Sequence, residues 1–102
     1  MRREKSEPTF SIVIPTCDRP DYLGQAIQSV LDQTLPASEI IIIDNGRMPV
    51  DSDFIPKDQR LRVIRALPRF GVSQARNLGA ILAIGDYLSF LDDDDYWDAN
   101  YL

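Results

Sequence analysis

Four consecutive isoleucines, Ile40 to Ile43, constrain the fold of this chain more than any other feature. β-branched residues of this kind are stiff and favour strands. A strand with one face in water would alternate apolar and polar residues, but this run is apolar throughout, so both of its faces must be covered. We therefore predict a strand over residues 39–44 that belongs to a parallel sheet.

The flanking segments alternate between strand and helix patterns. Residues 10–14, 61–65 and 86–91 are rich in β-branched, aromatic and leucine residues and predict three more strands. Apolar residues recur at helical spacing from Asp21 to about Thr34 and again over residues 71–84, and residues 96–102 are expected to start a further helix. The order β-α-β-loop-β-α-β predicts an α/β fold, a Rossmann-like parallel sheet with right-handed crossovers.

Composition limits the classes of partner. With 102 residues the chain holds one domain, for which we expect a flexible segment over residues 1–8 and the folded part over residues 9–102. A net charge of −5 argues against nucleic acid as a partner, and no apolar run approaches the roughly 18 residues of a membrane helix. The single cysteine indicates a reducing compartment, so we expect a cytoplasmic protein, with the cytoplasmic membrane face as an option for a full-length form.

Four consecutive aspartates, Asp92 to Asp95, follow the last predicted strand. Ligands of parallel α/β sheets bind beyond the carboxyl ends of the strands, where these residues fall. Adjacent carboxylates repel one another, and in an extended segment Asp92 and Asp94 would face the same point. Oxygen ligands of this kind suit Mg²⁺ or Mn²⁺, which proteins hold through one or two carboxylates plus substrate phosphates. The alternative is an acidic turn that caps a helix beginning at Tyr96.

Other polar residues follow the first two strands. Asp44 and Asn45 could meet a nucleoside, or could form an Asn-Gly turn in which Asp44 fixes the loop. Thr16, Cys17 and Asp18 could line a base pocket, but Asp18 could equally cap the first helix. Cys17 is read as a small packing residue rather than a nucleophile, because the chain has no histidine to activate it.

The second predicted helix and the C-terminal segment add three further candidates. Arg76 could bind a phosphate, for which a guanidinium is suited, or could be a solvated or acid-paired helix residue. Gly71 and Gly79 are expected to serve a helix start and close packing. Trp97 could stack on a sugar, although a hydrophobic plug beneath the fourth strand is the simpler interpretation.

Six ordered motifs resemble the inverting family 2 glycosyltransferases of the GT-A fold, from about Phe10 to the last residue. They occupy residues 10–16, 19–23, 29–34, 41–44, 71–79 and 85–97. The resemblance implies the N-terminal half of a GT-A domain and a hexosyltransferase-type activity in polysaccharide biosynthesis. In that activity a sugar passes from a nucleotide diphosphate sugar, with a UDP-sugar as the expected donor, to an acceptor hydroxyl of a saccharide, lipid or protein with inversion.

The resemblance also assigns residues. It makes residues 92–94 the Asp-x-Asp motif, in which Asp94 contacts the metal and Asp93 lies near the ribose and diphosphate. The extended-segment argument adds Asp92 as a second metal ligand. Resemblance and residue chemistry together give the expected nucleotide-sugar-binding positions Pro15, Thr16, Cys17, Asp18, Asp44, Asn45, Arg76, Asp92 and Asp93.

The chain departs from the family pattern in residue type and in length. Cys17 replaces a common aromatic, Asn45 a second acid, and Arg69 a common asparagine. The first two substitutions leave uridine, guanosine and thymidine open as the base. The family's acceptor half and catalytic base, an Asp or Glu, are expected beyond Leu102, so we expect little or no transferase activity from this chain alone.

Three other classes of protein are alternatives to this interpretation. A dinucleotide-binding oxidoreductase would carry a glycine-rich turn after the first strand, where this chain has Pro15 to Asp18. A phosphate-receiving signalling domain would place its acid pair after the first strand rather than the fourth. A non-catalytic interaction module with an acidic surface loop is the remaining alternative.

Overall fold

The computed structural model describes residues 8–18, 20–51, 53, 55–66, 71–99 and 101, without the side chains of residues 20 and 21. The expected flexible segment over residues 1–8 lies almost wholly outside this part, and so does Arg69. Within the described residues, no helix has the length and apolar character needed to cross a membrane.

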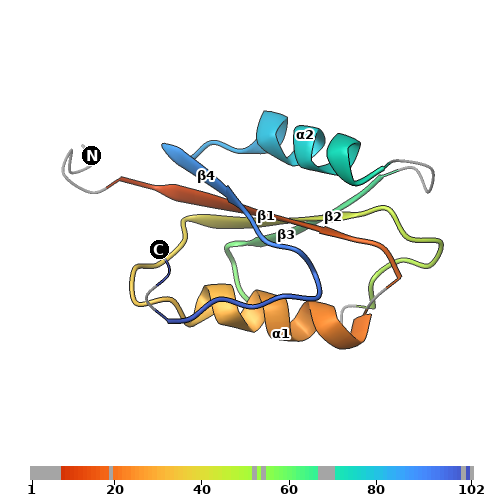
Figure 1. Ribbon diagram of the computed structural model, residues 1–102, viewed down its shortest axis with the longest axis horizontal. Coiled ribbons are helices and arrows are strands. Elements are labelled where there is room, and N and C mark those ends of the chain that lie inside the picture. The colour runs from red at the N-terminus through yellow and green to blue at the C-terminus, as the bar shows by residue number, and fades with distance from the viewer. Residues whose placement is uncertain are drawn as a thin grey trace.

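Four parallel strands form one sheet with the order β3-β2-β1-β4. The strands are β1 (Phe10–Thr16), β2 (Glu39–Asp44), β3 (Leu61–Arg65) and β4 (Tyr87–Phe90). Helices α1 (Pro20–Leu31) and α2 (Val72–Leu82) cover opposite faces of the sheet (Figure 1). The predicted α/β fold with a parallel sheet is therefore confirmed.

The isoleucine run explains why both faces need a cover. Ile40 and Ile42 pack in the cluster beneath α1, and Ile41 and Ile43 pack in the cluster beneath α2; all four side chains are fully buried. β1 divides in the same way, because successive side chains of a strand point to opposite faces. The central strands β1 and β2 therefore contribute buried side chains to both faces of the sheet, one packed against α1 and the other against α2.

Two segments differ from the sequence expectation. Helix α1 ends at Leu31 rather than near Thr34, and the N–H of Thr34 donates to the carbonyl of Ala99 at 2.8 Å. The expected helix over residues 96–102 is wrong in its described part, residues 96–99 and 101. Instead, the carbonyl of Asp98 accepts from the Gln33 side chain at 2.6 Å and that of Ala99 accepts from the N–H of Thr34 at 2.8 Å, so this segment is tied to the residues that follow α1. The chain after β4 therefore runs back beside α1 (Figure 1).

The direction of winding reverses next to β1. From β1 the chain moves to β2 and β3 on one side, and then crosses to β4 on the other side of β1. In parallel sheets the carboxyl ends of the strands flanking such a reversal leave a crevice where ligands bind. The carboxyl ends of β1 and β4 are therefore where a ligand site is expected.

Candidate functional site

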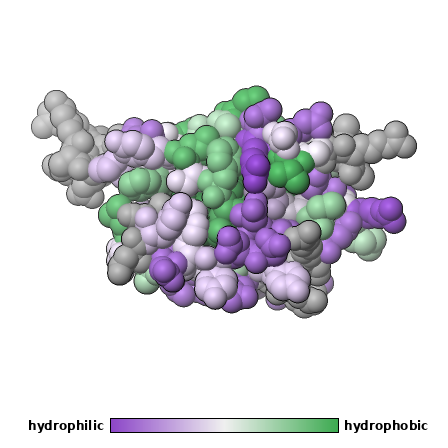
Figure 2. Space-filling model, in the orientation of Figure 1, coloured by the Kyte–Doolittle hydropathy of each residue, from purple (hydrophilic) through white to green (hydrophobic). Residues whose placement is uncertain are grey.

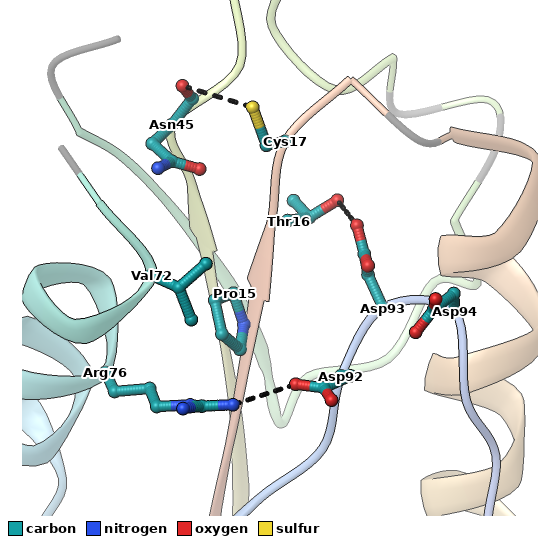
Figure 3. A pocket seen from close by; sticks show the side chains of 9 residues that line it. All are labelled: Pro15, Thr16, Cys17, Asn45, Val72, Arg76, Asp92, Asp93 and Asp94. Carbon is teal, nitrogen blue, oxygen red and sulfur yellow. Dashed lines mark hydrogen bonds and ion pairs between the residues drawn. The ribbon is translucent and has the colours of Figure 1, made fainter. Parts of the chain in front are cut away.

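A pocket of about 420 Å³ lies at this reversal. Its wall comes from the carboxyl ends of β1 and β2, the first two turns of α2 and the turn after β4 (Figure 3). The lining residues are Pro15, Thr16, Cys17, Asn45, Val72, Arg76, Asp92, Asp93 and Asp94. Eight of these nine were singled out from the sequence. Val72 was not, and its only signal was its position at the start of the helix after Gly71.

The aspartates form a turn rather than an extended continuation of β4. The strand ends at Phe90, and the N–H of Asp95 donates to the carbonyl of Asp92 at 3.1 Å. Asp93 is buried, whereas Asp92 and Asp94 are exposed. The extended geometry expected for Asp92 and Asp94 is therefore not what the chain adopts, and the three side chains point in different directions (Figure 3).

Two side chains from other elements hold this turn. The hydroxyl of Thr16, at the end of β1, donates to the Asp93 carboxylate at 2.8 Å. The guanidinium of Arg76, from α2, donates to the Asp92 carboxylate at 3.0 Å. Thr16 and Asp93 are both buried, so their hydrogen bond fixes the turn against the strand from within.

Arg76 lines the pocket, and only some of the N–H groups of its guanidinium form hydrogen bonds within the described residues. Its Nη2 is bonded to Asp92, and its Cζ lies 6.0 Å from the centre of the Phe90 ring. Its Nε is buried and has no hydrogen-bond partner among the described residues. Of the two sequence interpretations, the acid-paired arginine is the arrangement seen, and its position in the pocket wall leaves phosphate binding as a prediction.

Asp44 does not line the pocket. Its buried carboxylate accepts hydrogen bonds from the N–H groups of Gly46 at 3.0 Å and Val50 at 2.8 Å. It also forms an ion pair with Arg65 at 3.1 Å. Asp44 therefore fixes the loop that carries Asn45, as the Asn-Gly turn alternative proposed, and Asn45 is the member of the pair that reaches the pocket wall.

Asp18 secures the same loop from the other side. Its carboxylate accepts from the N–H of Arg47 at 2.9 Å and of Met48 at 3.4 Å. Its backbone φ of 56° is one that aspartate tolerates better than most residues. A Cβ on Gly46 would lie 2.5 Å from Asp18 Oδ1, so the close approach of the two segments requires glycine at that position. The exposed Cys17 thiol lies 3.9 Å from the Asn45 carbonyl oxygen and completes this wall.

Trp97 lies away from the pocket. Its ring stacks on Tyr101 with 4.5 Å between centroids, and it packs against the apolar cluster beneath α1. The apolar packing that the sequence favoured over sugar stacking is confirmed, and it lies on the α1 side of the sheet.

A divalent cation at this site would need oxygen ligands from the pocket wall. The described residues hold no group of three or more His, Cys, Asp and Glu side chains arranged to bind a metal. However, Asp92 and Asp94 both line this pocket, and Mg²⁺ is commonly held by one or two carboxylates with the remaining positions filled by water and substrate phosphates. The residues therefore fit a cation site that a phosphate ligand completes.

Known proteins share this architecture. The chain superimposes on the crystal structure of TarS from S. aureus with a TM-score of 0.74 at 22% identity, covering 90% of this chain and 18% of TarS. A crystal structure of TarS 1–349 in complex with UDP matches with a TM-score of 0.73 at 22% identity, covering 90% of this chain and 29% of that one. The parallel sheet and the position of its pocket define an α/β domain of the GT-A type.

The sequence comparisons identify the family. The model of glycosyl transferase family 2 matches residues 11–102, and the chain belongs to this family. An uncharacterized glycosyltransferase of Haemophilus influenzae is 37% identical over 93 residues, which are 87% of this chain and 37% of that protein. The putative teichuronic acid biosynthesis glycosyltransferase TuaG of Bacillus subtilis is 33% identical over 100 residues, which are 94% of this chain and 40% of that protein. The chain thus spans about two fifths of the length of these two relatives.

Proposed function

We propose that the pocket binds the nucleotide diphosphate of a nucleotide-sugar, together with Mg²⁺ or Mn²⁺. The observation that carries this proposal is the arrangement of Asp92, Asp94 and Arg76 around one pocket at the winding reversal of the sheet. Carboxylates can hold the cation, and a guanidinium can meet a phosphate. The UDP complex of the structurally similar TarS supports a uridine nucleotide as the ligand.

The pocket walls divide by chemistry. Thr16, Cys17 and Asn45 form the side that we assign to the base and ribose, and Asn45 could accept from or donate to a base edge through its amide. Arg76 and the first turn of α2 form the side that we assign to the diphosphate, because the helix N-terminus adds partial positive charge there. Asp18 and Asp44 would act on the base side indirectly, by holding the loop that carries Asn45.

In a complete enzyme the reaction would be sugar transfer with inversion. The oxygen of an acceptor hydroxyl attacks the anomeric carbon, and the bond from that carbon to the diphosphate oxygen breaks, so that the nucleotide diphosphate leaves. A bound cation supplies Lewis-acid stabilisation of the charge on that leaving group. The residues of this chain bind and orient the donor, and the proton of the acceptor hydroxyl passes to a base that we assign to none of them.

Calorimetry of the 102-residue chain with UDP, GDP and dTDP, each with and without Mn²⁺, tests the proposal. We expect Mn²⁺-dependent binding of one nucleotide and at least a tenfold weaker affinity in Asp94→Ala, because a cation that loses one of two carboxylates loses much of its protein attachment. Asp32→Ala is the matched control, since Asp32 is an exposed acid bonded to Gln28 and lies outside the pocket.

Two results would contradict the proposal. The first is an absence of nucleotide binding in folded wild-type chain under every condition, which would favour a non-catalytic interaction module. The second is equal nucleotide affinity in Asp94→Ala and the wild type, which would place the binding elsewhere. Circular dichroism of each variant establishes that the chain has folded.

A further inference from the structure

Arg76 and Asp92 form an ion pair, yet each of them is also suited to bind one of the two proposed ligands. Arg76 suits the diphosphate and Asp92 suits the cation. Arg76 comes from α2 and Asp92 from the turn after β4, and their side chains meet in the pocket wall at 3.0 Å (Figure 3). The guanidinium is the natural partner of a phosphate, and the carboxylate is a ligand of Mg²⁺ or Mn²⁺. In the free protein these two groups neutralise each other instead.

The pair is weak enough to exchange partners. The side chains of Arg76 and Asp92 are 41% and 58% exposed, and ion pairs in such settings contribute little to stability. By contrast, the neighbouring bond from Thr16 to Asp93 is buried, so it would hold the turn in place when the exposed pair separates. The turn can thus keep its position while Arg76 and Asp92 change partners.

Arg76 already has donor capacity beyond the ion pair. The contact with Asp92 uses Nη2 alone and the side chain is 41% exposed, while Phe90 lies beside the guanidinium at 6.0 Å. A planar guanidinium has five N–H donors, and a phosphate can accept two of them side by side. A phosphate that enters the pocket could therefore accept two hydrogen bonds from Arg76, in place of the one that Asp92 accepts.

We propose that the Arg76–Asp92 ion pair couples binding of the diphosphate to binding of the cation. The diphosphate draws Arg76 away from Asp92, which leaves the Asp92 carboxylate available to the cation, and a cation on Asp92 leaves Arg76 available to the phosphate. Without its co-ligand, each ligand must compete with the ion pair and binds more weakly. This inference rests on the proposed function of the pocket.

Metal-free nucleotide binding gives the sharpest test. In EDTA, Asp92→Asn is expected to bind UDP about two- to fivefold more tightly than the wild type, the fold-change that corresponds to loss of an exposed ion pair. Asp94→Asn is the matched control, because it removes the same charge from the same turn without touching Arg76. We expect the gain in Asp94→Asn to be clearly smaller.

Cation binding gives the reciprocal test. Arg76→Ala is expected to bind Mn²⁺ alone about two- to fivefold more tightly than the wild type. This gain should disappear when Arg76→Ala is made in the Asp92→Asn background, since no ion pair remains to be released. If the gain arose only because removal of the arginine charge reduces repulsion of Mn²⁺, Arg76→Ala would raise the Mn²⁺ affinity equally in the wild type and in Asp92→Asn.

The outcomes separate the inference from the function on which it rests. Equal gains in UDP affinity for Asp92→Asn and Asp94→Asn, or equal gains in Mn²⁺ affinity in the two backgrounds, would overturn the coupling while leaving the nucleotide site intact. Failure of folded wild-type chain to bind UDP with or without Mn²⁺ would overturn both. The Asn substitutions keep the shape of exposed side chains, so the folded state should survive them.

Discussion

Glu39 is a buried carboxylate at the amino end of β2, opposite the pocket, with 8% of its surface exposed. Burial by itself raises the pKa of this carboxyl. However, it accepts hydrogen bonds from the Ile84 N–H at 2.7 Å and the Ser11 hydroxyl at 2.6 Å, and it is paired with Arg62 at 3.3 Å. These contacts outweigh the burial, so the pKa of Glu39 lies below its ordinary value of 4.5.

This depressed pKa predicts how stability changes with pH. Because the pKa is lower in the folded state, Glu39 contributes stability that is fully present above the unfolded pKa of about 4.5 and is lost as the pH falls through the folded pKa. We expect Glu39→Gln to unfold with about 1–3 kcal/mol less free energy than the wild type at pH 7, and the difference to shrink below pH 4.5. Urea unfolding from pH 7 to pH 3 measures it, with Asp32→Asn as the exposed-acid control. A difference that stays constant over this range would refute the assignment.

The aspartate run shows how far single residues could be interpreted from sequence. Its location followed from the strand pattern, because residues that follow a parallel strand must lie at the carboxyl edge of the sheet. The conformation of the run did not follow, since it depends on the buried hydrogen bond from Thr16, which is remote in the chain. Asp44 was similarly ambiguous: only the folded loop shows that Gly46, Val50 and Arg65 occupy its carboxylate.

At the scale of elements, α2 packs on β1 through glycine rather than through a side chain. Gly79 is buried in the middle of the helix, and a Cβ placed on it would overlap the side chain of Val13, lying only 2.8 Å from Cγ2. Glycine within a helix costs about 1 kcal/mol relative to alanine, so its presence here is explained by the close approach of helix and strand. The expectation that Gly79 serves close packing is confirmed.

We predict that Gly79→Ala destabilises the chain although alanine favours helices. Overpacking of a filled interface costs about 1–3 kcal/mol, which exceeds the gain of about 1 kcal/mol in helix propensity. Guanidinium chloride unfolding of Gly79→Ala, Val13→Ala and the double variant measures the effect. The double variant should be less destabilised than the sum of the two single variants, because the smaller side chain at position 13 makes room for the new methyl group. Additive effects would show that Val13 is not the obstacle.

The elements themselves could be predicted because their signals are local and consistent. The apolar periodicity of α1 and the isoleucine run of β2 each predict one structure and one degree of burial, and both are confirmed. The end of α1 and the segment after Tyr96 could not be predicted, because Gln33 and Thr34 bond to carbonyl groups more than 60 residues away. The end of α1 and the path of residues 96–99 therefore involve long-range hydrogen bonds, which local sequence patterns do not predict.

At the scale of the whole molecule, one edge of the sheet carries several exposed apolar side chains. β4 is an edge strand, and apolar side chains on it and around the end of α2 remain exposed. These side chains, which we call the β4 patch, are Ile81, Ile84, Tyr87, Leu88 and Phe90. Figure 2 shows hydrophobic residues gathered over this part of the surface. An edge strand beside exposed apolar residues favours association between chains.

We therefore predict that charging the β4 patch makes the isolated chain less prone to self-association. Ile81 and Ile84 are 79% and 87% exposed, so Ile81→Lys with Ile84→Lys should change the free energy of unfolding by no more than about 0.5 kcal/mol for each site. Light scattering over a series of chain concentrations should show less growth of large species than in the wild type. Met48→Lys, which charges an exposed residue on the loop after β2, is the control and should scatter like the wild type. If Met48→Lys suppressed scattering as well as the double variant did, net charge rather than the β4 patch would govern association.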